Sequence, residues 1–379
     1  MSKYSAALEP LKIRNVEFKN RIFLVSMGLD MATVDGAFSN ELRSFYLDVA
    51  KGGVGAMILS NAAINESTAL MPNALKLFNK DHANSFKSVI EDAAKENVIV
   101  AAQLQHYGGQ GTTFLTRGRP ALTPSGIETA SIKKIDPKYH VKELTVADIE
   151  MTVDGFKKSA QLCVDAGAKF IQLQASNGYL LSSFLSKYTN KRDDDYGGSP
   201  AKRSRLLIEV LRAVREVVGS EVVIGIRIGI NDYVGDEGLT VEELEPLIPI
   251  LEESGADIFE CSFCIADTFH RLSENTVEMR KELTDQVKIF KSYASAPVGF
   301  AGFISSLQEG CDLIESGVVD YIGMARALLA DNALVNKELS GHESEVHRCL
   351  WEGNCFKDKY NPRYDRVYCC VNPNYLRPQ

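Results

Sequence analysis

The sequence predicts an α/β protein in which eight parallel strands alternate with eight helices. Short apolar runs alternate with longer amphipathic stretches along almost the whole chain. The apolar runs are nearly continuous, which is typical of strands that are buried on both faces of a parallel sheet. A doubly wound open sheet alternates in the same way, but no GxGxxG motif follows an early strand here. The count of eight strand–helix pairs therefore favours a (β/α)8 TIM barrel.

Eight segments fit buried strands, and each is followed by a stretch with helical periodicity. The predicted strands are residues 22–27, 55–64, 98–106, 170–176, 222–229, 257–263, 297–303 and 320–325. The predicted helices are residues 41–51, 82–97, 145–166, 200–218, 240–254, 278–294, 305–316 and 331–339. A short hairpin over residues 12–20 is expected to precede the first strand.

Capping signals support several of these boundaries. Thr145 and Thr240 stand where an N-cap side chain is favoured, and Pro200 suits a first helical turn. Glycines that favour a left-handed helix end are Gly167, Gly219, Gly255 and Gly317. Two connections, residues 107–143 and 177–199, exceed about 15 residues, and such loops after barrel strands usually build the active site.

Composition excludes several classes of protein. The chain has 379 residues, of which 45% are hydrophobic and 24% charged, so a disordered or fibrous protein is excluded. A net charge of −8 disfavours nucleic acid as the main partner. Apolar runs stay short of the roughly 20 residues that a membrane helix needs. The first residues lack a signal-peptide pattern, so a cytoplasmic location is expected.

The eight cysteines are unevenly distributed, because four of them fall within residues 349–370. In a cytoplasmic protein they are expected to be thiols or metal ligands rather than disulfides. We therefore expect a barrel over residues 1–340 and a short cysteine-rich C-terminal extension over residues 341–379.

Residues at the carboxyl ends of the predicted strands are the first candidates for an active site. These candidates are Ser26, Met27, Gly28, Gln103, Gln174, Asn177, Arg227, Gly302, Phe303, Gly323, Ala325 and Arg326. Barrels commonly hold a phosphate after their last two strands. Gly302 and Gly323 would let the backbone approach that anion, and Arg326 would bind it through two hydrogen bonds. The alternative to a phosphate site is that Gly302 and Gly323 form tight turns and that Arg326 forms an ion pair on the surface.

The run Asn190-Lys191-Arg192-Asp193-Asp194-Asp195-Tyr196-Gly197-Gly198-Ser199, with Gly178-Tyr179-Leu180-Leu181 before it, resembles the signature of the Old Yellow Enzyme, or NADH:flavin oxidoreductase, family. Asn20-Arg21-Ile22, Ser26-Met27, Gln103-Leu104 and Arg227 match other marks of that family in order. The resemblance covers about residues 8 to 340. It implies a (β/α)8 barrel that binds FMN and uses NAD(P)H as co-substrate.

The cysteine-rich extension resembles the branch that contains 2,4-dienoyl-CoA reductase and trimethylamine dehydrogenase. Members of that branch hold a four-iron cluster on four cysteines after the barrel. Three positions here, Cys349, Cys355 and Cys369, line up with those ligands, but Glu352 stands where the remaining cysteine is expected. Iron–sulfur clusters prefer sulfur ligands, so an intact cluster is not expected unless Cys370 substitutes.

The resemblance also implies roles for single residues. Gln103 and Arg227 would contact the FMN ring, and the alternative is that these two side chains are polar packing inside the barrel. Ser26, Met27 and Gly28 would run beside the ring. Tyr179 would donate a proton to the substrate, unless it is a structural tyrosine of the loop. Gln174 and Asn177 occupy the positions of the usual His–His or His–Asn pair, and their amides would bind a substrate carbonyl. His270, in a loosely matching loop, would line the substrate pocket.

We therefore expect an FMN-dependent oxidoreductase of the ene-reductase type. It would transfer hydride from NAD(P)H through FMN to the activated C=C bond of an α,β-unsaturated carbonyl, carboxylate or thioester. The alternatives are an amine or N-methyl dehydrogenase, or a subunit that needs a separate electron-transfer partner. Direct reduction by NAD(P)H is expected because the second, nucleotide-binding half of the branch is not in this sequence. Arg377 would either reach the site of a neighbouring subunit in a homo-oligomer or lie on a flexible tail.

Overall fold

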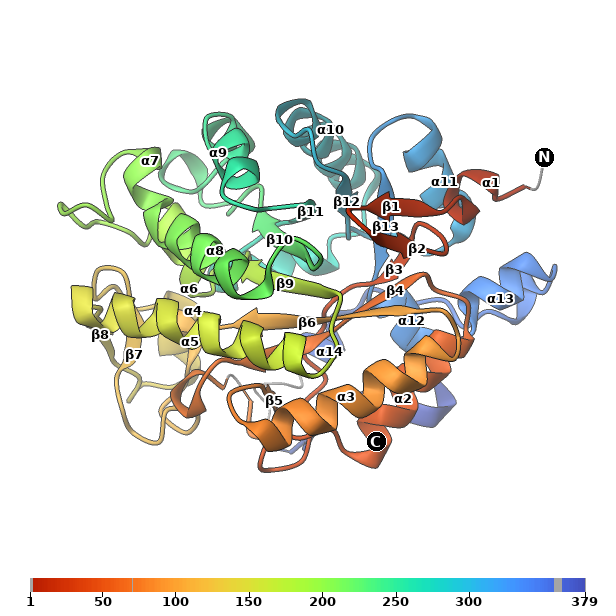
Figure 1. The fold of residues 1–379 in the computed structure, drawn as a ribbon, viewed down its shortest axis with the longest axis horizontal. Coiled ribbons are helices and arrows are strands. Elements are labelled where there is room, and N and C mark those ends of the chain that lie inside the picture. The colour runs from red at the N-terminus through yellow and green to blue at the C-terminus, as the bar shows by residue number, and fades with distance from the viewer. Residues whose placement is uncertain (1–2, 70, 358–362, 379) are drawn as a thin grey trace.

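Eight parallel strands close into a barrel in the computed structural model, which describes residues 3–69, 71–357 and 363–378 (Figure 1). The barrel strands are β3 (Ile22–Leu24), β4 (Ala56–Ala63), β6 (Ile99–Gln105), β9 (Phe170–Ala175), β10 (Val223–Gly229), β11 (Ile258–Ser262), β12 (Val298–Phe300) and β13 (Tyr321–Met324). Strand β13 pairs in parallel with β3, which closes the ring. The predicted (β/α)8 fold is confirmed.

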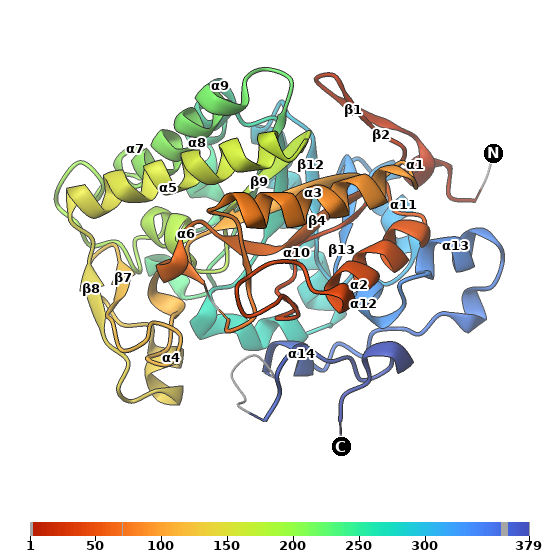
Figure 2. The same cartoon turned by 60° about the horizontal axis from the view of Figure 1, so that its bottom comes forward.

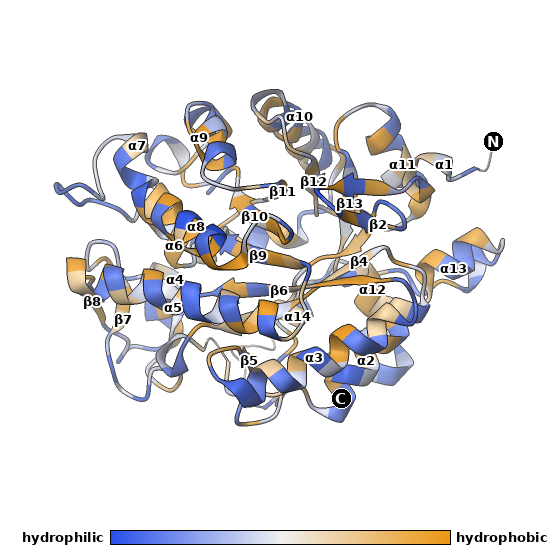
Figure 3. Cartoon of the chain, in the orientation of Figure 1, coloured by the Kyte–Doolittle hydropathy of each residue, from blue (hydrophilic) through white to orange (hydrophobic). Residues whose placement is uncertain are grey.

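Helices surround the barrel and pack their apolar faces against it (Figure 3). The main ones are α2 (Asn40–Lys51), α3 (Lys80–Ala94), α5 (Val146–Asp165), α8 (Arg205–Val218), α9 (Ile248–Glu253), α10 (Val277–Tyr293), α11 (Leu307–Glu315), α12 (Arg326–Ala330) and α13 (Leu334–Leu339). Shorter ones are α1 (Ser5–Leu8) and α7 (Pro200–Arg203). Within the described part of the chain, no helix is long and apolar enough to cross a bilayer.

The predicted hairpin consists of β1 (Leu11–Ile13) and β2 (Val16–Phe18), which pair in antiparallel fashion. The ring of Phe18 packs against Phe23 at 5.0 Å and edge-on against Phe170 at 5.8 Å. Because Phe170 and Phe23 lie near the amino ends of their strands, the hairpin closes that end of the barrel. The carboxyl ends are left for binding and chemistry.

Most capping predictions hold. Thr145 and Asp148 form a reciprocal capping box at α5, and Pro200 occupies the first turn of α7. The four glycines Gly167, Gly219, Gly255 and Gly317 all have positive φ angles. The continuous helix predicted for residues 240–254 is wrong, because Pro246 lacks the N–H that continuation would use. The segment instead forms the 3-10 turn η4 (Val241–Leu244), in which Thr240 makes no side-chain cap bond to a described residue, followed by α9.

The long connections contain structure of their own. The first holds the 3-10 turn η2 (Gly108–Gln110), α4 (Ala130–Ile135) and a small parallel sheet of β7 (Ala121–Thr123) and β8 (Val141–Glu143). The second holds α6 (Leu180–Leu185), and the loop after β11 forms the 3-10 helix η5 (Ala266–Ser273). These elements surround the carboxyl ends of the strands. The remaining pieces are β5 (Leu75–Lys76), η1 (Glu66–Thr68) and η3 (Gly235–Glu237).

The cysteine-rich extension folds back onto the barrel as η6 (Glu343–Glu345), α14 (Asn354–Lys357) and η8 (Pro373–Tyr375). The Val367 N–H donates to the Leu29 carbonyl at 2.9 Å, and the Asn372 amide donates to the Leu329 carbonyl at 2.8 Å. The backbone N–H of Arg377 donates to the Cys369 carbonyl at 2.9 Å, so this arginine belongs to a packed segment. Figure 2 shows α14 and the hairpin β1–β2 on opposite sides of the barrel.

Candidate functional site

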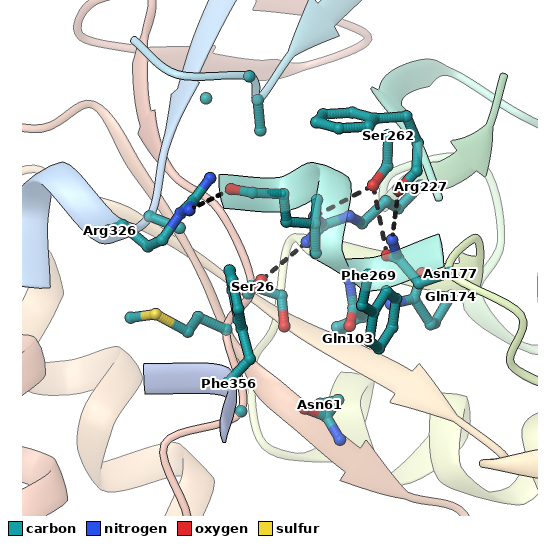
Figure 4. A pocket seen from close by; sticks show the side chains of 18 of the residues that line it. Ser26, Asn61, Gln103, Gln174, Asn177, Arg227, Ser262, Phe269, Arg326 and Phe356 are labelled. Carbon is teal, nitrogen blue, oxygen red and sulfur yellow. Dashed lines mark hydrogen bonds between the residues drawn. The ribbon is translucent and has the colours of Figure 1, made fainter. Parts of the chain in front are cut away.

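A cavity lies at the carboxyl ends of the barrel strands (Figure 4). The structure brings to its lining every residue predicted to bind the cofactor or to act in catalysis. Those residues are Ser26, Met27, Gly28, Gln103, Gln174, Asn177, Tyr179, Arg227, Gly302, Phe303, Gly323, Ala325 and Arg326. Except for Tyr179, from the loop that carries α6, they lie in six of the eight strands or within three or four residues after them, so the barrel topology explains most of their convergence.

His270 is the exception. Its side chain is 66% exposed, and its Nε2 atom lies 3.8 Å from a carboxylate oxygen of Glu274. The same 3-10 helix, η5, sends Phe269 and Leu272 into the cavity lining instead. The structure therefore does not support the predicted substrate contact of His270, because the turn directs this side chain to solvent.

Further lining residues were not predicted: Asn61, Ser262, Phe263, Phe269, Leu272, Ala301, Ile304, Trp351 and Phe356. Asn61 and Ser262 lie near the carboxyl ends of their strands, so they could have been predicted from the barrel topology. Phe263 directly follows β11, at the end of a predicted strand. The other aromatic residues lie in the loop that carries η5 and in the extension, where the sequence carries no periodic signal. Trp351 and Phe356 show that the extension forms part of the cavity wall.

Arg227 occupies the centre of the polar side of the cavity. Its Nη1 donates to the Ser26 carbonyl at 2.7 Å, and its Nη2 donates to the Ser262 hydroxyl at 3.4 Å (Figure 4). Its Nε lies 3.2 Å from a carboxylate oxygen of Glu260, a residue with no exposed surface. Burial raises the pKa of Glu260, and the nearby Arg227 charge opposes that rise.

Gln103 is held in place by Gln172, which lies deeper in the barrel. The Gln103 amide nitrogen donates to the Gln172 carbonyl oxygen at 2.7 Å, and the Gln172 amide nitrogen donates to Glu260 at 2.9 Å. Because a carboxylate only accepts hydrogen bonds, it orients Gln172 and through it Gln103. The side-chain oxygen of Gln103 is thereby left to the cavity.

Gln174 and Asn177 are engaged differently. The Ser176 hydroxyl donates to the Gln174 carbonyl oxygen at 2.7 Å, which leaves the Gln174 amide nitrogen on the cavity side. The Asn177 amide nitrogen donates to the Phe263 carbonyl at 2.9 Å, and its oxygen accepts from Ser176 at 2.8 Å. Asn177 thus braces the end of β11, and Gln174 is the better placed donor for a ligand.

Tyr179 precedes α6, and the signature loop fixes that helix in place. The Asn190 amide donates to the carbonyls of Phe184 and Tyr196, both at 2.7 Å. The Arg192 guanidinium binds the carbonyls of Pro124 and Leu144 at 2.7 Å. The motif that carries the family resemblance is therefore a scaffold that positions Tyr179, which is 9% exposed at the cavity.

Arg326 lies between the cavity and the extension. Its guanidinium donates to the Leu272 carbonyl at 2.6 Å and lies 4.4 Å from the centre of the Trp351 ring and 5.0 Å from that of Phe356. Such cation–π contacts favour a charged guanidinium even where water is excluded. Burial lowers the pKa of Arg326, but a guanidinium keeps its proton in proteins.

A second, smaller cavity adjoins Arg326 on the side of the extension. Its lining includes the four cysteines Cys349, Cys355, Cys369 and Cys370, together with Glu352. The Asn354 amide donates to the Cys370 sulfur at 3.3 Å, and the Val371 N–H donates to the Cys369 sulfur at 3.5 Å. Among the described residues, no three His, Cys, Asp or Glu side chains converge closely enough to hold a single metal ion.

His106 is a buried structural group whose Nδ1 atom accepts the Gly108 N–H at 3.0 Å. Burial lowers its pKa to about 4. Between pH 6.5 and about 4 the unfolded chain binds this proton and the folded protein does not, so stability falls as pH falls. We expect the free energy of unfolding to drop by about 2 to 3 kcal/mol more between pH 7.5 and 4.5 in the wild type than in His106→Asn. Urea unfolding at both pH values measures this, and parallel pH profiles would contradict it.

Comparison with known proteins agrees with this geometry. Residues 7–345 match the NADH:flavin oxidoreductase / NADH oxidase family. A metal reductase from Desulforamulus reducens is 31% identical over 375 residues, which cover 97% of this chain and 53% of the relative. A cinnamate reductase from Clostridium sporogenes is 27% identical over 391 residues, covering 98% of this chain and 58% of the relative.

A solved structure of 2-naphthoyl-CoA reductase in complex with 2-naphthoyl-CoA shares the fold. Its TM-score is 0.89 at 23% identity, and the match covers 98% of this chain and 57% of that chain. This chain spans about half the length of these relatives. The family match covers most of the sequence, and the chain belongs to the NADH:flavin oxidoreductase / NADH oxidase family.

Proposed function

We propose that the protein is an FMN-dependent oxidoreductase that uses NAD(P)H to reduce an activated C=C bond. The observation that carries the proposal is the convergence of Gln103, Arg227, Gln174 and Tyr179 on one cavity. The names of one relative, a cinnamate reductase, and of one structural neighbour, a 2-naphthoyl-CoA reductase, denote enzymes that act on a carboxylate and on a thioester. A carboxylate- or thioester-activated alkene is accordingly the substrate class that we propose.

The residues present fit FMN. Gln103 offers an oriented carbonyl oxygen and Arg227 a positive charge, which suit the imide N–H and the electron-rich oxygen of the flavin pyrimidine ring. At the other end, a Cβ on Gly323 would lie 2.6 Å from Val25 and 3.1 Å from Ala301, so the backbone there leaves no room for a side chain. Gly302 and Arg326 line the same end, and we propose that they bind the phosphate.

FMN bound there would relay hydride from NAD(P)H to the β-carbon of the alkene. The protein's own side chains supply the rest. The Gln174 amide would donate to the substrate carbonyl oxygen, where negative charge develops. The Tyr179 hydroxyl would give its proton to the α-carbon and recover one from solvent. In sum, NAD(P)H, a proton and the alkene become NAD(P)⁺ and the saturated product.

An anaerobic titration tests this function. Protein loaded with FMN is mixed with NADPH or NADH while the flavin absorbance is followed, and then a cinnamate or an enoyl thioester is added. We expect bleaching by one nucleotide and recovery of the absorbance with the alkene. Flavin that dithionite reduces but neither nucleotide bleaches would overturn direct reduction by NAD(P)H. Bleaching that an amine but no nucleotide produces would favour the alternative, an amine or N-methyl dehydrogenase.

We further propose the division into a barrel, residues 1–340, and a cysteine-rich extension, residues 341–379. Under the alternative function, a subunit that takes electrons from a separate partner, this extension would be the part that receives them. The four cysteines that line one cavity, two of them accepting N–H hydrogen bonds, support an iron–sulfur cluster there. Cys370 would replace Glu352 as the fourth ligand.

Iron content decides this second proposal. We expect wild-type protein reconstituted anaerobically with iron and sulfide to retain both, and Cys349→Ser and Cys370→Ser to lose most of that iron. Glu352→Ala should keep it, and so should the control Cys163→Ser, whose thiol lies buried in α5. Wild-type protein without iron or sulfide after reconstitution would contradict the cluster.

A further inference from the structure

The barrel interior beneath the cavity holds a charged residue that the proposed reaction does not use. Glu260 lies on β11 with no exposed surface, directly opposite Arg227 in the strand register. Water cannot solvate its carboxylate there, and burying an unpaired charge is costly. Its partners are Arg227, at 3.2 Å, and the Gln172 amide, at 2.9 Å.

The groups that face Glu260 can be followed around the barrel. Arg227 faces it from β10 and Gln172 from β9. On β12 the position opposite Glu260 is Gly299, and the ring of Tyr321 from β13 fills the space where a side chain of Gly299 would lie. The Tyr321 hydroxyl donates to the Phe259 carbonyl at 2.9 Å. Arg227 is therefore the one cation that approaches Glu260 among the described residues.

This arrangement affects two groups that line the cavity. Burial raises the pKa of Glu260, but the Arg227 guanidinium at 3.2 Å opposes this and favours the ionised carboxylate. The negative charge of that form offsets part of the positive charge of Arg227 within a region of low dielectric constant. The same carboxylate orients the amides of Gln172 and Gln103, as described above. Both effects converge on the polar side of the cavity, where the pyrimidine ring of FMN would lie under the proposed function.

We propose that Glu260 is a positioning residue that lowers the reduction potential of FMN bound in the cavity. Reduced FMN gains electron density in its pyrimidine ring, and a nearby positive charge stabilises it. Because Glu260 neutralises part of the Arg227 charge, it weakens that stabilisation. A lower potential makes the reduced cofactor a stronger hydride donor, which suits poorly activated alkenes such as carboxylates. The inference rests on the proposed binding of FMN.

Glu260→Gln tests the inference, with the midpoint potential of bound FMN as the readout. The potential is measured anaerobically by slow enzymatic reduction in the presence of a reference dye. We expect the ratio of reduced to oxidised FMN at a fixed potential to rise at least tenfold, which corresponds to a positive shift of about 30 mV for a two-electron couple. Dissociation constants of FMN, measured separately for the oxidised and reduced forms, should differ from the wild type mainly for the reduced form.

Two further variants keep the test decisive. Glu338 on α13 is also a buried carboxylate, and it pairs with Arg348 and accepts the Leu307 N–H at 2.7 Å. Glu338→Gln therefore removes a buried charge outside the cavity lining, and we expect it to lower the melting temperature without moving the potential. Glu260→Asp keeps the charge but withdraws it by one methylene, and we expect a smaller positive shift, which can be measured if Glu260→Gln does not fold.

The outcomes are distinct. An unchanged or lowered potential in the variants of Glu260 that bind FMN would overturn the inference and leave the proposed function intact. An equal shift in Glu338→Gln would also overturn it, because the effect would then be global rather than local. A wild-type protein that binds no FMN would overturn the proposed function and this inference with it.

Discussion

Tyr179→Phe is expected to slow reduction of the alkene by about 10²- to 10⁴-fold, which is the usual contribution of a positioned general acid. The substitution removes one hydroxyl and keeps the ring, which packs in an apolar cluster with Tyr107 and Met71. We therefore expect the fold, the binding of FMN and the rate of flavin reduction by NAD(P)H to be unchanged. Stopped-flow measurement of the two half-reactions separates these steps.

A matched control is Tyr188→Phe. The Tyr188 hydroxyl donates to Asp267 at 3.3 Å, and the residue belongs to the same long loop but lies outside the cavity lining. Turnover in this variant should match that of the wild type. If Tyr179→Phe reduces the alkene at the wild-type rate, the proton comes from elsewhere and the assignment of Tyr179 fails.

Gln174→Leu is expected to lower the turnover number by about 10²- to 10³-fold, as loss of one donor to a developing oxyanion typically does. Leucine fills a similar volume but cannot donate to the substrate carbonyl. The Ser176 hydroxyl, which now donates to Gln174 at 2.7 Å, would still find the Asn177 oxygen at 2.8 Å, so the loop should remain intact. Steady-state kinetics with a single alkene measure the effect.

Gln174→His provides the rescue, because an imidazole N–H can donate where the amide did. Asn177→Ala should behave differently, since Asn177 braces the backbone at Phe263. We expect this variant to lower the melting temperature as well as the rate. A turnover number for Gln174→Leu that equals the wild-type value would show that the carbonyl is activated by another group.

The barrel could be predicted from the sequence because each strand is a continuous apolar run and the apolar residues of each helix repeat with a helical spacing. The break in the predicted helix at Pro246 could also have been predicted from the sequence. It was missed because the apolar residues on both sides of Pro246 keep a helical spacing. Segments of three residues, such as β7 and β8, are too short to show a period. They form because the loop folds against the barrel, which is a tertiary effect.

Some residues of the cavity lining could likewise be predicted from the sequence, and others could not. Gln103, Arg227 and Gln174 stand at strand ends, where topology alone predicts that they converge. Trp351 and Phe356 do not, because their place depends on how the extension packs against Arg326. His270 was predicted to line the cavity, but its side chain faces solvent. The position of a residue in a loop does not show which side chains face the cavity, because the conformation of the turn decides this.

The aromatic wall from the extension has a consequence for assembly. Trp351 and Phe356 follow the last barrel strand by more than twenty positions, so they leave the ribosome after all eight strands have been made. A barrel that closes before these two residues emerge would have one side of its cavity open. We expect the cofactor to enter most easily in that interval and the late aromatic side chains to slow its escape afterwards, so that loading of mature protein is slower than loading during translation.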